Sequence, residues 1–259
     1  MSTQASTEPR AERRRRTSAL YVDLHSHVVP SGDDGARSVE EGLELCRHAA
    51  AHGTRLLYAT PHAQPAGRWH AWTVERQRRA VESLERMQDA CAAFGLELRL
   101  GWEVAPRGIV GEVRSFALDG LDAVLVEFPG PWFEFADSLL ETRRQIDQIR
   151  AAGLEVVLAH PERCVEIQQD PRLVLPFAED GALICFNADS FLGGHGDATE
   201  RCAWQLLGLG LGDLVASDAH RRDRPSRLHE AVEAIARRTD RERAVALADG
   251  SALTRLSAL

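Results

Sequence analysis

Histidine, aspartate and glutamate residues follow short apolar segments at several places in this chain, and such side chains commonly bind metal ions. The stretch YVDLHSHVVPSGDDG, residues 21–35, carries two histidines two positions apart and then a pair of aspartates. Side chains two apart on a strand point to the same side, so His25 and His27 can reach one ion together. The same spacing joins Asp218 to His220 in ASDAH.

A single histidine after a strand is more often a hydrogen-bonded structural residue than a metal ligand. Nine imidazole and carboxylate groups after six predicted strands favour metal binding instead, because converging carboxylates repel one another and resist desolvation unless cations compensate them. The nine predicted metal ligands are His25, His27, Asp34, His62, Glu103, Glu127, His160, Asp218 and His220.

Nine ligands exceed what one ion binds, so the set predicts two or three divalent ions with some bridging carboxylates. Nitrogen and oxygen donors without a thiolate suit Mn²⁺, Zn²⁺ or Fe²⁺. Arg163 and Arg224 follow two of the ligand segments, and a guanidinium matches phosphate oxygens. Surface solvation is the alternative for either arginine alone. Together they predict hydrolysis of a phosphate ester by metal-generated hydroxide, with Arg163 and Arg224 as catalytic, substrate-binding residues.

The elements that must position these side chains repeat in a regular order of helix, glycine, apolar strand and polar loop. Helical spacing of apolar residues predicts helices over residues 38–52, 73–94 and 137–152, each followed by a glycine that suits a left-handed helix end. About seven apolar strands alternate with such segments. This order predicts an α/β fold with a parallel sheet, and polar residues at the strand ends favour closure into a barrel.

Composition limits the class of protein. The 259 residues are 44% hydrophobic, and a formal net charge of -8 argues against a general nucleic-acid-binding surface. Five scattered cysteines without a CxxC pair suit a reducing cytoplasm, and no apolar run is long enough for a transmembrane helix. Residues 1–18 are predicted to be a disordered basic tail. Its arginine run, 13–16, could touch anionic lipid or an acidic partner, although a solvated tail is favoured.

Two other phosphate chemistries lack their motifs. A cysteine-dependent tyrosine phosphatase needs an arginine six positions after its cysteine, and none of the five cysteines has one. The chain also lacks a glycine-rich GxxxxGK[ST] phosphate loop.

The segments DLHSH, DDGARS, ATPH, GWE, VEFP, AHPER, FNADSFLG and ASDAH occur in that order, within a resemblance that covers roughly residues 21–235. In this order they resemble the polymerase-and-histidinol-phosphatase (PHP) superfamily. Within it, the chain is most similar to the bacterial manganese-dependent protein-tyrosine phosphatases of capsule and exopolysaccharide loci. The resemblance implies that residues 19–259 form a distorted, seven-stranded, TIM-like β/α barrel holding three ions, usually Mn²⁺.

The resemblance also implies how the ligands divide among the ions. One ion would be held by His25, His27, Glu103 and Asp218; a second by Glu103 as a bridge with Glu127 and His160; a third by Asp34, His62 and His220. Arg163 and Arg224 match phosphate-binding arginines, although Arg224 follows SDAH at a spacing one residue shorter than expected. His195 matches no role in the family, and we predict a surface loop histidine.

The implied substrate is a phosphotyrosine protein, namely the C-terminal tyrosine cluster of a membrane-linked tyrosine kinase. One alternative is a small-molecule phosphoesterase of the same superfamily, acting on histidinol phosphate, a nucleotide or a sugar phosphate. Another is a non-catalytic regulator that keeps the barrel and binds a partner. Missing ligands would mark such a regulator, and in this chain none is missing.

Overall fold

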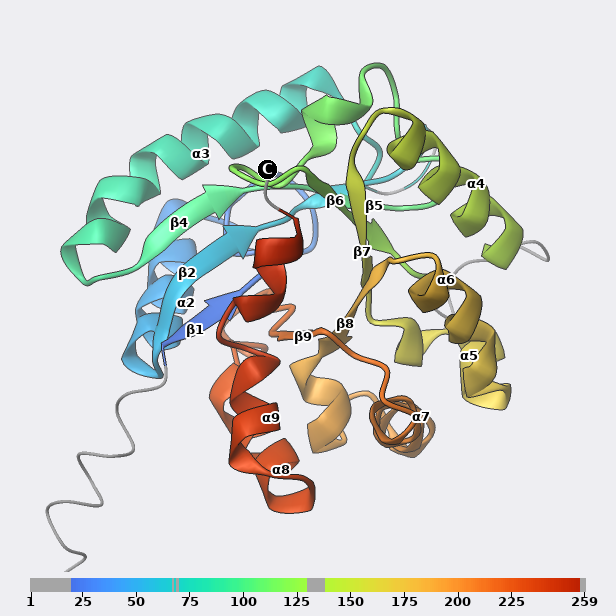
Figure 1. The fold of residues 1–259 in the computed structure, drawn as a ribbon. Helices are drawn as coiled ribbons and strands as arrows, with labels where there is room; N and C mark the ends of the chain where they lie inside the picture. Colours follow the sequence, from blue (N-terminus) through green and yellow to red (C-terminus); the bar gives the residue numbers. More distant parts are fainter. Residues whose placement is uncertain (1–19, 67, 69, 130–137, 257–259) are drawn as a thin grey trace, which may run out of the picture.

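The computed structural model of the chain describes residues 20–66, 68, 70–129 and 138–256. The predicted tail, residues 1–18, lies outside the described residues. The described strands are all parallel and form two sheets (Figure 1). The first sheet has the order β1 (Tyr21–Asp23), β2 (Thr54–Ala59) and β4 (Glu97–Leu100). The second has the order β3 (His62–Ala63), β5 (Glu103–Val104), β6 (Ala123–Glu127), β7 (Glu155–Ala159), β8 (Leu183–Asn187) and β9 (Leu214–Ala216).

Two of the predicted strands are divided. Thr60 and Pro61 separate β2 from β3, and Gly101 and Trp102 separate β4 from β5, so the same two chain segments pair in both sheets. The sheets also meet at a parallel bridge between Ser26 and Ala219, just beyond β1 and β9. The predicted α/β fold with parallel strands is confirmed. The closed seven-stranded barrel stays a prediction.

Each of the three predicted helices begins and ends within one residue of its expected bounds. They are α2 (Val39–Ala51), α3 (Val74–Ala93) and α4 (Ser138–Ala151), and each packs against a strand: α2 on β2, α3 on β4 and α4 on β7 (Figure 1). The Ser38 side chain caps α2 by accepting the Glu41 N–H at 3.2 Å. Gly53, after α2, has a φ of 98°, the left-handed geometry expected of the glycine there.

The remaining helical segments follow β5, β7, β8 and β9. The α-helices are α5 (Val165–Gln169), α6 (Leu175–Glu179), α7 (Asp197–Gly208), α8 (Leu228–Arg238) and α9 (Arg241–Ala246). The 3-10 helices are η1 (Val113–Phe116), η2 (Pro161–Arg163), η3 (Pro171–Val174), η4 (Ala188–Leu192) and η5 (Ser251–Arg255).

Apolar side chains fill both faces of the strands. On β6, Val124 and Val126 belong to the large cluster beneath the helices, whereas Ala123 and Leu125 belong to a second cluster that Leu253 of η5 joins. Both faces are therefore dry, as the continuous apolar segments predict. Polar side chains are left to gather beyond the carboxyl ends of the strands.

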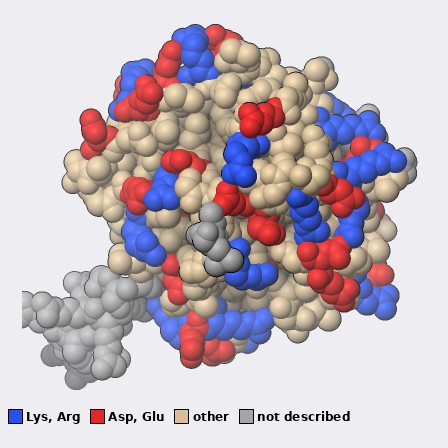
Figure 2. Space-filling view, turned by 45° about the horizontal axis from the view of Figure 1, so that its top comes forward, with Lys and Arg blue, Asp and Glu red and all other residues tan. Residues whose placement is uncertain are grey.

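The surface carries charges of both signs. Figure 2 shows acidic and basic side chains interspersed over one face. A mixed face of this kind does not form the continuous basic strip that binds a nucleic-acid backbone. Among the described residues, no helix combines the length and apolar character needed to cross a membrane.

Two helical glycines provide a test of the packing. A Cβ at Gly42 in α2 would lie 2.2 Å from the Val28 carbonyl oxygen and 2.7 Å from Met87 Cε, whereas a Cβ at Gly208 in α7 meets nothing within 4 Å. We expect Gly42→Ala to lower the free energy of unfolding by about 2–3 kcal/mol through overpacking. The matched control, Gly208→Ala, should leave it unchanged or raise it by about 0.5–1 kcal/mol. Urea denaturation measures both, and equal stabilities would contradict the close contact between α2 and α3.

Candidate metal centre

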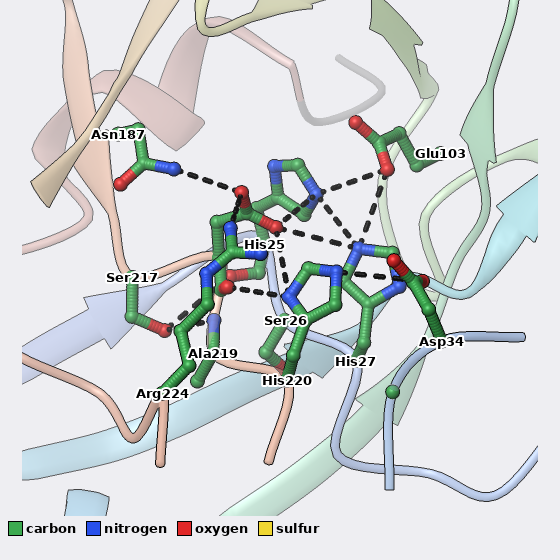
Figure 3. Close-up of polar contacts among 12 residues, drawn as sticks. His25, Ser26, His27, Asp34, Glu103, Asn187, Ser217, Ala219, His220 and Arg224 are labelled. Atoms are coloured by element: carbon green, nitrogen blue, oxygen red, sulfur yellow. Dashed lines mark hydrogen bonds and ion pairs between the residues drawn. The ribbon is translucent and has the colours of Figure 1, made fainter. Parts of the chain in front are cut away.

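Glu103 lies at the middle of a group that contains all nine predicted ligands, part of which Figure 3 shows. Its Oε2 atom lies 3.3 Å from His25 Nε2 and 2.9 Å from His62 Nδ1. Its Oε1 atom lies 2.8 Å from His160 Nε2. Glu127 is close by, with Oε2 3.9 Å from His62 Nδ1.

Two aspartates extend the group. Asp218 Oδ1 lies 3.4 Å from His25 Nε2 and 3.5 Å from His27 Nε2. Asp34 Oδ1 lies 3.5 Å from the Nε2 atoms of both His62 and His220. The structure therefore brings all nine side chains together, although they span nearly 200 positions of the chain.

The carboxyl ends of the strands position these side chains. His25 and His27 follow β1, Glu127 ends β6, and His160 directly follows β7. Because the strands are parallel, their ends meet on one side of the sheets, which is where α/β enzymes place their chemistry. Asp34 lies farther along the loop after β1.

Two of the predicted ligands have unusual backbone geometry. His160 has a φ of 40° and Asp218 a φ of 52°, in the left-handed region that non-glycine residues seldom adopt. Their N–H groups nevertheless donate hydrogen bonds, His160 to the carbonyl of Cys185 in β8 at 2.7 Å and Asp218 to the carbonyl of His25, just beyond β1, at 2.8 Å. Such strained residues gather at functional sites, where the surrounding structure holds them in place.

Hydrogen bonds to the outer ring nitrogens orient two of the histidines. His27 Nδ1 lies 3.0 Å from Asp33 Oδ2, and His220 Nδ1 lies 2.7 Å from the Asp218 carbonyl oxygen. A carbonyl oxygen and a carboxylate accept, so each Nδ1 carries a proton and Nε2 is the ring nitrogen left to bind a cation. Metal-binding histidines are usually oriented in this way.

The unsatisfied polar atoms fit bound cations. Within the described residues, five buried atoms of these side chains make no hydrogen bond: Asp34 Oδ1, His62 Nδ1, Glu103 Oε2, Glu127 Oε2 and His160 Nδ1. Several of them lie within ion-pair distance of one another, such as Glu103 Oε2 and His62 Nδ1 at 2.9 Å, without forming a hydrogen bond. Burial, and then the neighbouring Glu103 carboxylate, raise the pKa of Glu127 to about 8. Buried polar atoms without partners are costly, and divalent ions would satisfy them.

Three groups of donors have ligand atoms within 4.8 Å of one another. Glu103 is shared by two of them, whereas the predicted ligands His160 and Asp218 belong to none of the three. The groups are His25, His27 and Glu103; His62, Glu103 and Glu127; and His27, Asp34, His62 and His220.

The two predicted phosphate-binding arginines both contact Asp218. Arg163 Nη1 donates to Asp218 Oδ2 at 2.9 Å, and Arg224 Nη2 pairs with the same oxygen. Asn187 Nδ2 also donates to it at 2.8 Å (Figure 3). Both arginines line a cavity of about 480 Å³, and seven of the nine predicted ligands, all except His25 and His27, line it too.

Sequence reasoning missed several residues of the site. Asp33 had no predicted role, but its side chain is fully buried against His27. Burial would raise the pKa of Asp33, yet the hydrogen bond and charge of His27 hold it well below its usual range. Asn187 stood at a predicted strand end without an assigned role. Gln64, Arg68 and His70 also line the cavity, and no strand-end pattern marks them.

His195 differs in part from the predicted surface histidine. Its side chain is half-buried, and its Nε2 atom is buried without a hydrogen-bond partner in the described part of the chain. Burial, and then the charges of Arg163 and Arg224, lower the pKa of His195 to about 3. The imidazole is therefore neutral at pH 7.

Asp33→Asn tests the orientation of His27. We expect the variant to bind Mn²⁺ about 10- to 100-fold more weakly, because an amide does not fix the Nδ1–H tautomer as a carboxylate does. Competition against a chelator measures the affinity, with circular dichroism as a check on folding. Asp89→Asn, on the exposed face of α3, is the matched control. An affinity equal to that of the wild type would contradict the orienting role.

Glu162→Gln tests whether the buried carboxyl group of Glu162 makes the stability of the protein depend on pH. Glu162 Oε1 accepts the Ser190 hydroxyl at 2.7 Å and the Asn187 N–H at 2.9 Å, and burial raises its pKa from 4.5 to about 7. The folded state therefore holds the proton longer than the unfolded state, so stability present below pH 4.5 is lost as the pH rises through about 7.

In metal-free protein, we expect Glu162 to contribute a loss of roughly 2.5 kcal/mol between pH 5 and 8. Glu162→Gln should remove this contribution and leave the one that the raised pKa of Glu127 makes over the same range. Urea denaturation at both pH values measures it. The exposed Glu179→Gln is the control. A Glu162→Gln variant with the pH dependence of the wild type would refute the assignment.

Comparison with known proteins identifies close sequence relatives. The family model for capsular polysaccharide synthesis, CpsB/CapC, matches residues 21–253. The putative tyrosine-protein phosphatase CapC of Staphylococcus aureus is 26% identical over 203 residues, covering 77% of this chain and 76% of CapC. The tyrosine-protein phosphatase YwqE of Bacillus subtilis is 29% identical over 206 residues, covering 77% of each chain.

Solved structures agree with these relatives. A chain from the crystal structures of YwqE from Bacillus subtilis and CpsB from Streptococcus pneumoniae, described as unique metal-dependent tyrosine phosphatases, matches with a TM-score of 0.72. Its sequence identity is 26%, with 92% of this chain and 96% of that chain covered. The histidinol phosphate phosphatase of Lactococcus lactis shares the fold at a TM-score of 0.52 and 14% identity, covering 88% of this chain and 94% of its own. This chain belongs to the CpsB/CapC family of capsular polysaccharide synthesis proteins.

Proposed function

We propose that this protein is a metal-dependent protein-tyrosine phosphatase. The observation that carries the proposal is one cavity lined both by the buried histidine and carboxylate group and by Arg163 and Arg224. Membership of the CpsB/CapC family supports it, since the relatives CapC and YwqE are named tyrosine-protein phosphatases. The proposed substrate is the phosphotyrosine cluster of a membrane-linked tyrosine kinase.

The nine predicted ligands would hold two or three divalent ions, with Mn²⁺ as the proposed metal. When bound, such ions supply Lewis acidity and lower the pKa of a bound water, which phosphate-ester hydrolysis requires. Glu103 would bridge two of them, because it belongs to two donor groups. Asp34, His62 and His220 would hold the ion nearest to solvent, since the Asp34 side chain is 47% exposed.

Arg163 and Arg224 would bind the phosphoryl group. Each presents several N–H donors in one plane, so a guanidinium can keep Asp218 and still turn other donors to phosphate oxygens. Asp218 and Asn187 would orient the guanidinium groups through the shared Oδ2 atom. Both arginines are partly exposed, Arg163 at 11% and Arg224 at 30%, which leaves them accessible to a substrate.

We also infer that residues 19–259 form one domain, a closed PHP-type barrel. The barrel has seven strands if β2 and β3 are counted as one strand and β4 and β5 as another. The Ser26–Ala219 bridge supports closure, as does the hydrogen bond from the His27 N–H to the Ala219 carbonyl at 2.6 Å. A cytoplasmic location is the further proposal. It is supported by five cysteines that are all free and buried.

A panel of phosphate esters tests the activity. With Mn²⁺ present, we expect kcat/KM for phosphotyrosine peptides to exceed that for histidinol phosphate, nucleotides and sugar phosphates by at least about tenfold, a difference of roughly 1.4 kcal/mol. A clear preference for one metabolite would instead support a small-molecule phosphoesterase. Metal-loaded protein without any hydrolysis would favour the non-catalytic regulator.

His160→Ala tests the metal centre directly. We expect kcat/KM to fall by about 100-fold or more, since even outer residues of metal sites contribute 10- to 100-fold. The fold should survive, because His160 faces the cavity. Thermal unfolding checks this, and His52→Ala, on the exposed end of α2, is the matched control. Full activity in His160→Ala would refute the ligand assignment.

A further inference from the structure

His70 lines the cavity of the candidate centre but belongs to none of the three donor groups. It lies in the segment between β3 and α3, and its side chain is 20% exposed. Its ring lies nearly parallel to that of His62, at an interplanar angle of 7° and a centroid distance of 5.2 Å. Its Nε2 atom faces Asp34 Oδ1 at 3.9 Å.

Neither ring nitrogen of His70 has a hydrogen-bond partner within the described ranges. Nδ1 is buried without one, and the 3.9 Å from Nε2 to Asp34 is too long for a hydrogen bond. A largely buried polar group without hydrogen-bond partners is costly, so its position at a cavity wall points to a ligand that satisfies it.

Hydrogen bonds hold the backbone around His70 in place. The Gln64 N–H donates to the His70 carbonyl at 3.1 Å, and the Trp72 N–H donates to the Gln64 carbonyl at 2.8 Å. Arg76 Nη1 donates to the Ala71 carbonyl at 3.1 Å. The Trp72 ring packs edge-on against Trp102, with centroids 4.4 Å apart. The imidazole is therefore positioned before any ligand arrives, which lowers the cost of binding.

The ring geometry argues against His70 as another metal ligand. An imidazole directs its lone pair in the plane of the ring, so the rings of His70 and His62, which are stacked and only 7° from parallel, do not aim at one ion. The stacked rings of His27 and His220, which share a donor group, are inclined by 25°. The group of His27, Asp34, His62 and His220 already supplies four donors there. An imidazole carries at least one N–H in either protonation state, and an N–H suits an anionic oxygen.

We propose that His70 is a substrate-binding residue that donates a hydrogen bond to the phosphoryl group of a phosphate monoester. It acts at the Asp34 end of the ligand group, whereas Arg163 and Arg224 meet the cavity at Asp218. The phosphoryl group would thus be bound by His70 at one end of the metal centre and by the two arginines at the other. This inference rests on the proposed function and adds a contact that the sequence pattern did not indicate.

Calorimetric titration of the Mn²⁺-loaded protein with inorganic phosphate tests the contact without requiring turnover. We expect His70→Ala to weaken phosphate binding about tenfold, the usual effect of losing a hydrogen bond to a charged group. His70→Gln should recover part of the loss, because its amide N–H reaches near the position of Nε2. His52→Ala, an exposed histidine at the end of α2, should bind phosphate like the wild type.

Two further measurements separate binding from structure. The KM for a phosphotyrosine peptide should rise in parallel with the phosphate Kd while kcat stays within about twofold. The Mn²⁺ content of His70→Ala, measured by mass spectrometry, should equal that of the wild type. Unchanged phosphate affinity would overturn the proposal, and so would the loss of an ion, because His70 would then be a ligand.

The outcomes also separate this inference from the proposed function. Wild-type protein that binds phosphate through His70 but leaves phosphotyrosine peptides intact would refute the tyrosine phosphatase and keep the contact. If the wild type hydrolyses those peptides and His70→Ala binds phosphate as tightly as the wild type, the tyrosine phosphatase is kept and the His70 contact is refuted.

Discussion

The convergence of buried carboxylates and imidazoles at one place is the constraint on which the rest of this structure depends. Glu103, Glu127 and Asp218 are each almost completely buried, and like charges so close together oppose folding unless cations or hydrogen-bond donors compensate them. The arginines and Asn187 compensate Asp218. Glu103 and Glu127 each keep a buried oxygen that accepts no hydrogen bond from the described residues, which is why a metal centre explains the arrangement better than a polar core does.

The parallel strands make this convergence possible. Because both faces of strands such as β6 are covered by apolar side chains, the strand ends are the places where polar side chains can gather. The backbone has adapted as well: His160 and Asp218 adopt left-handed conformations directly after or near the ends of β7 and β9. Gly35 of the DDG segment allows the loop to approach His27 closely, since a Cβ there would lie 2.3 Å from the His27 carbonyl oxygen.

The gathering of most of the nine side chains could be predicted from sequence, because strand periodicity and the helix–glycine–strand order place them at or just beyond the carboxyl ends of predicted strands. Asp34 is the exception, since it lies farther along the loop after β1. The supporting residues could not. Asp33 orients His27 and Asn187 donates to Asp218, and such partnerships depend on distances between segments that periodicity does not encode. His70 lies on a loop without any period. The division of β2 from β3 was missed too, although Pro61 lacks the N–H that a continuous strand uses.

Glu103 has a consequence for how the centre assembles. One carboxylate belongs to two donor groups and also bonds His160, so ions at the two positions would not load independently. An ion at one position would fix the carboxylate and offset its negative charge, and by reciprocity each ion would alter the affinity for the other to the same degree. A centre of this kind would be a linked equilibrium, with the fraction of fully assembled protein set by the concentration of free metal.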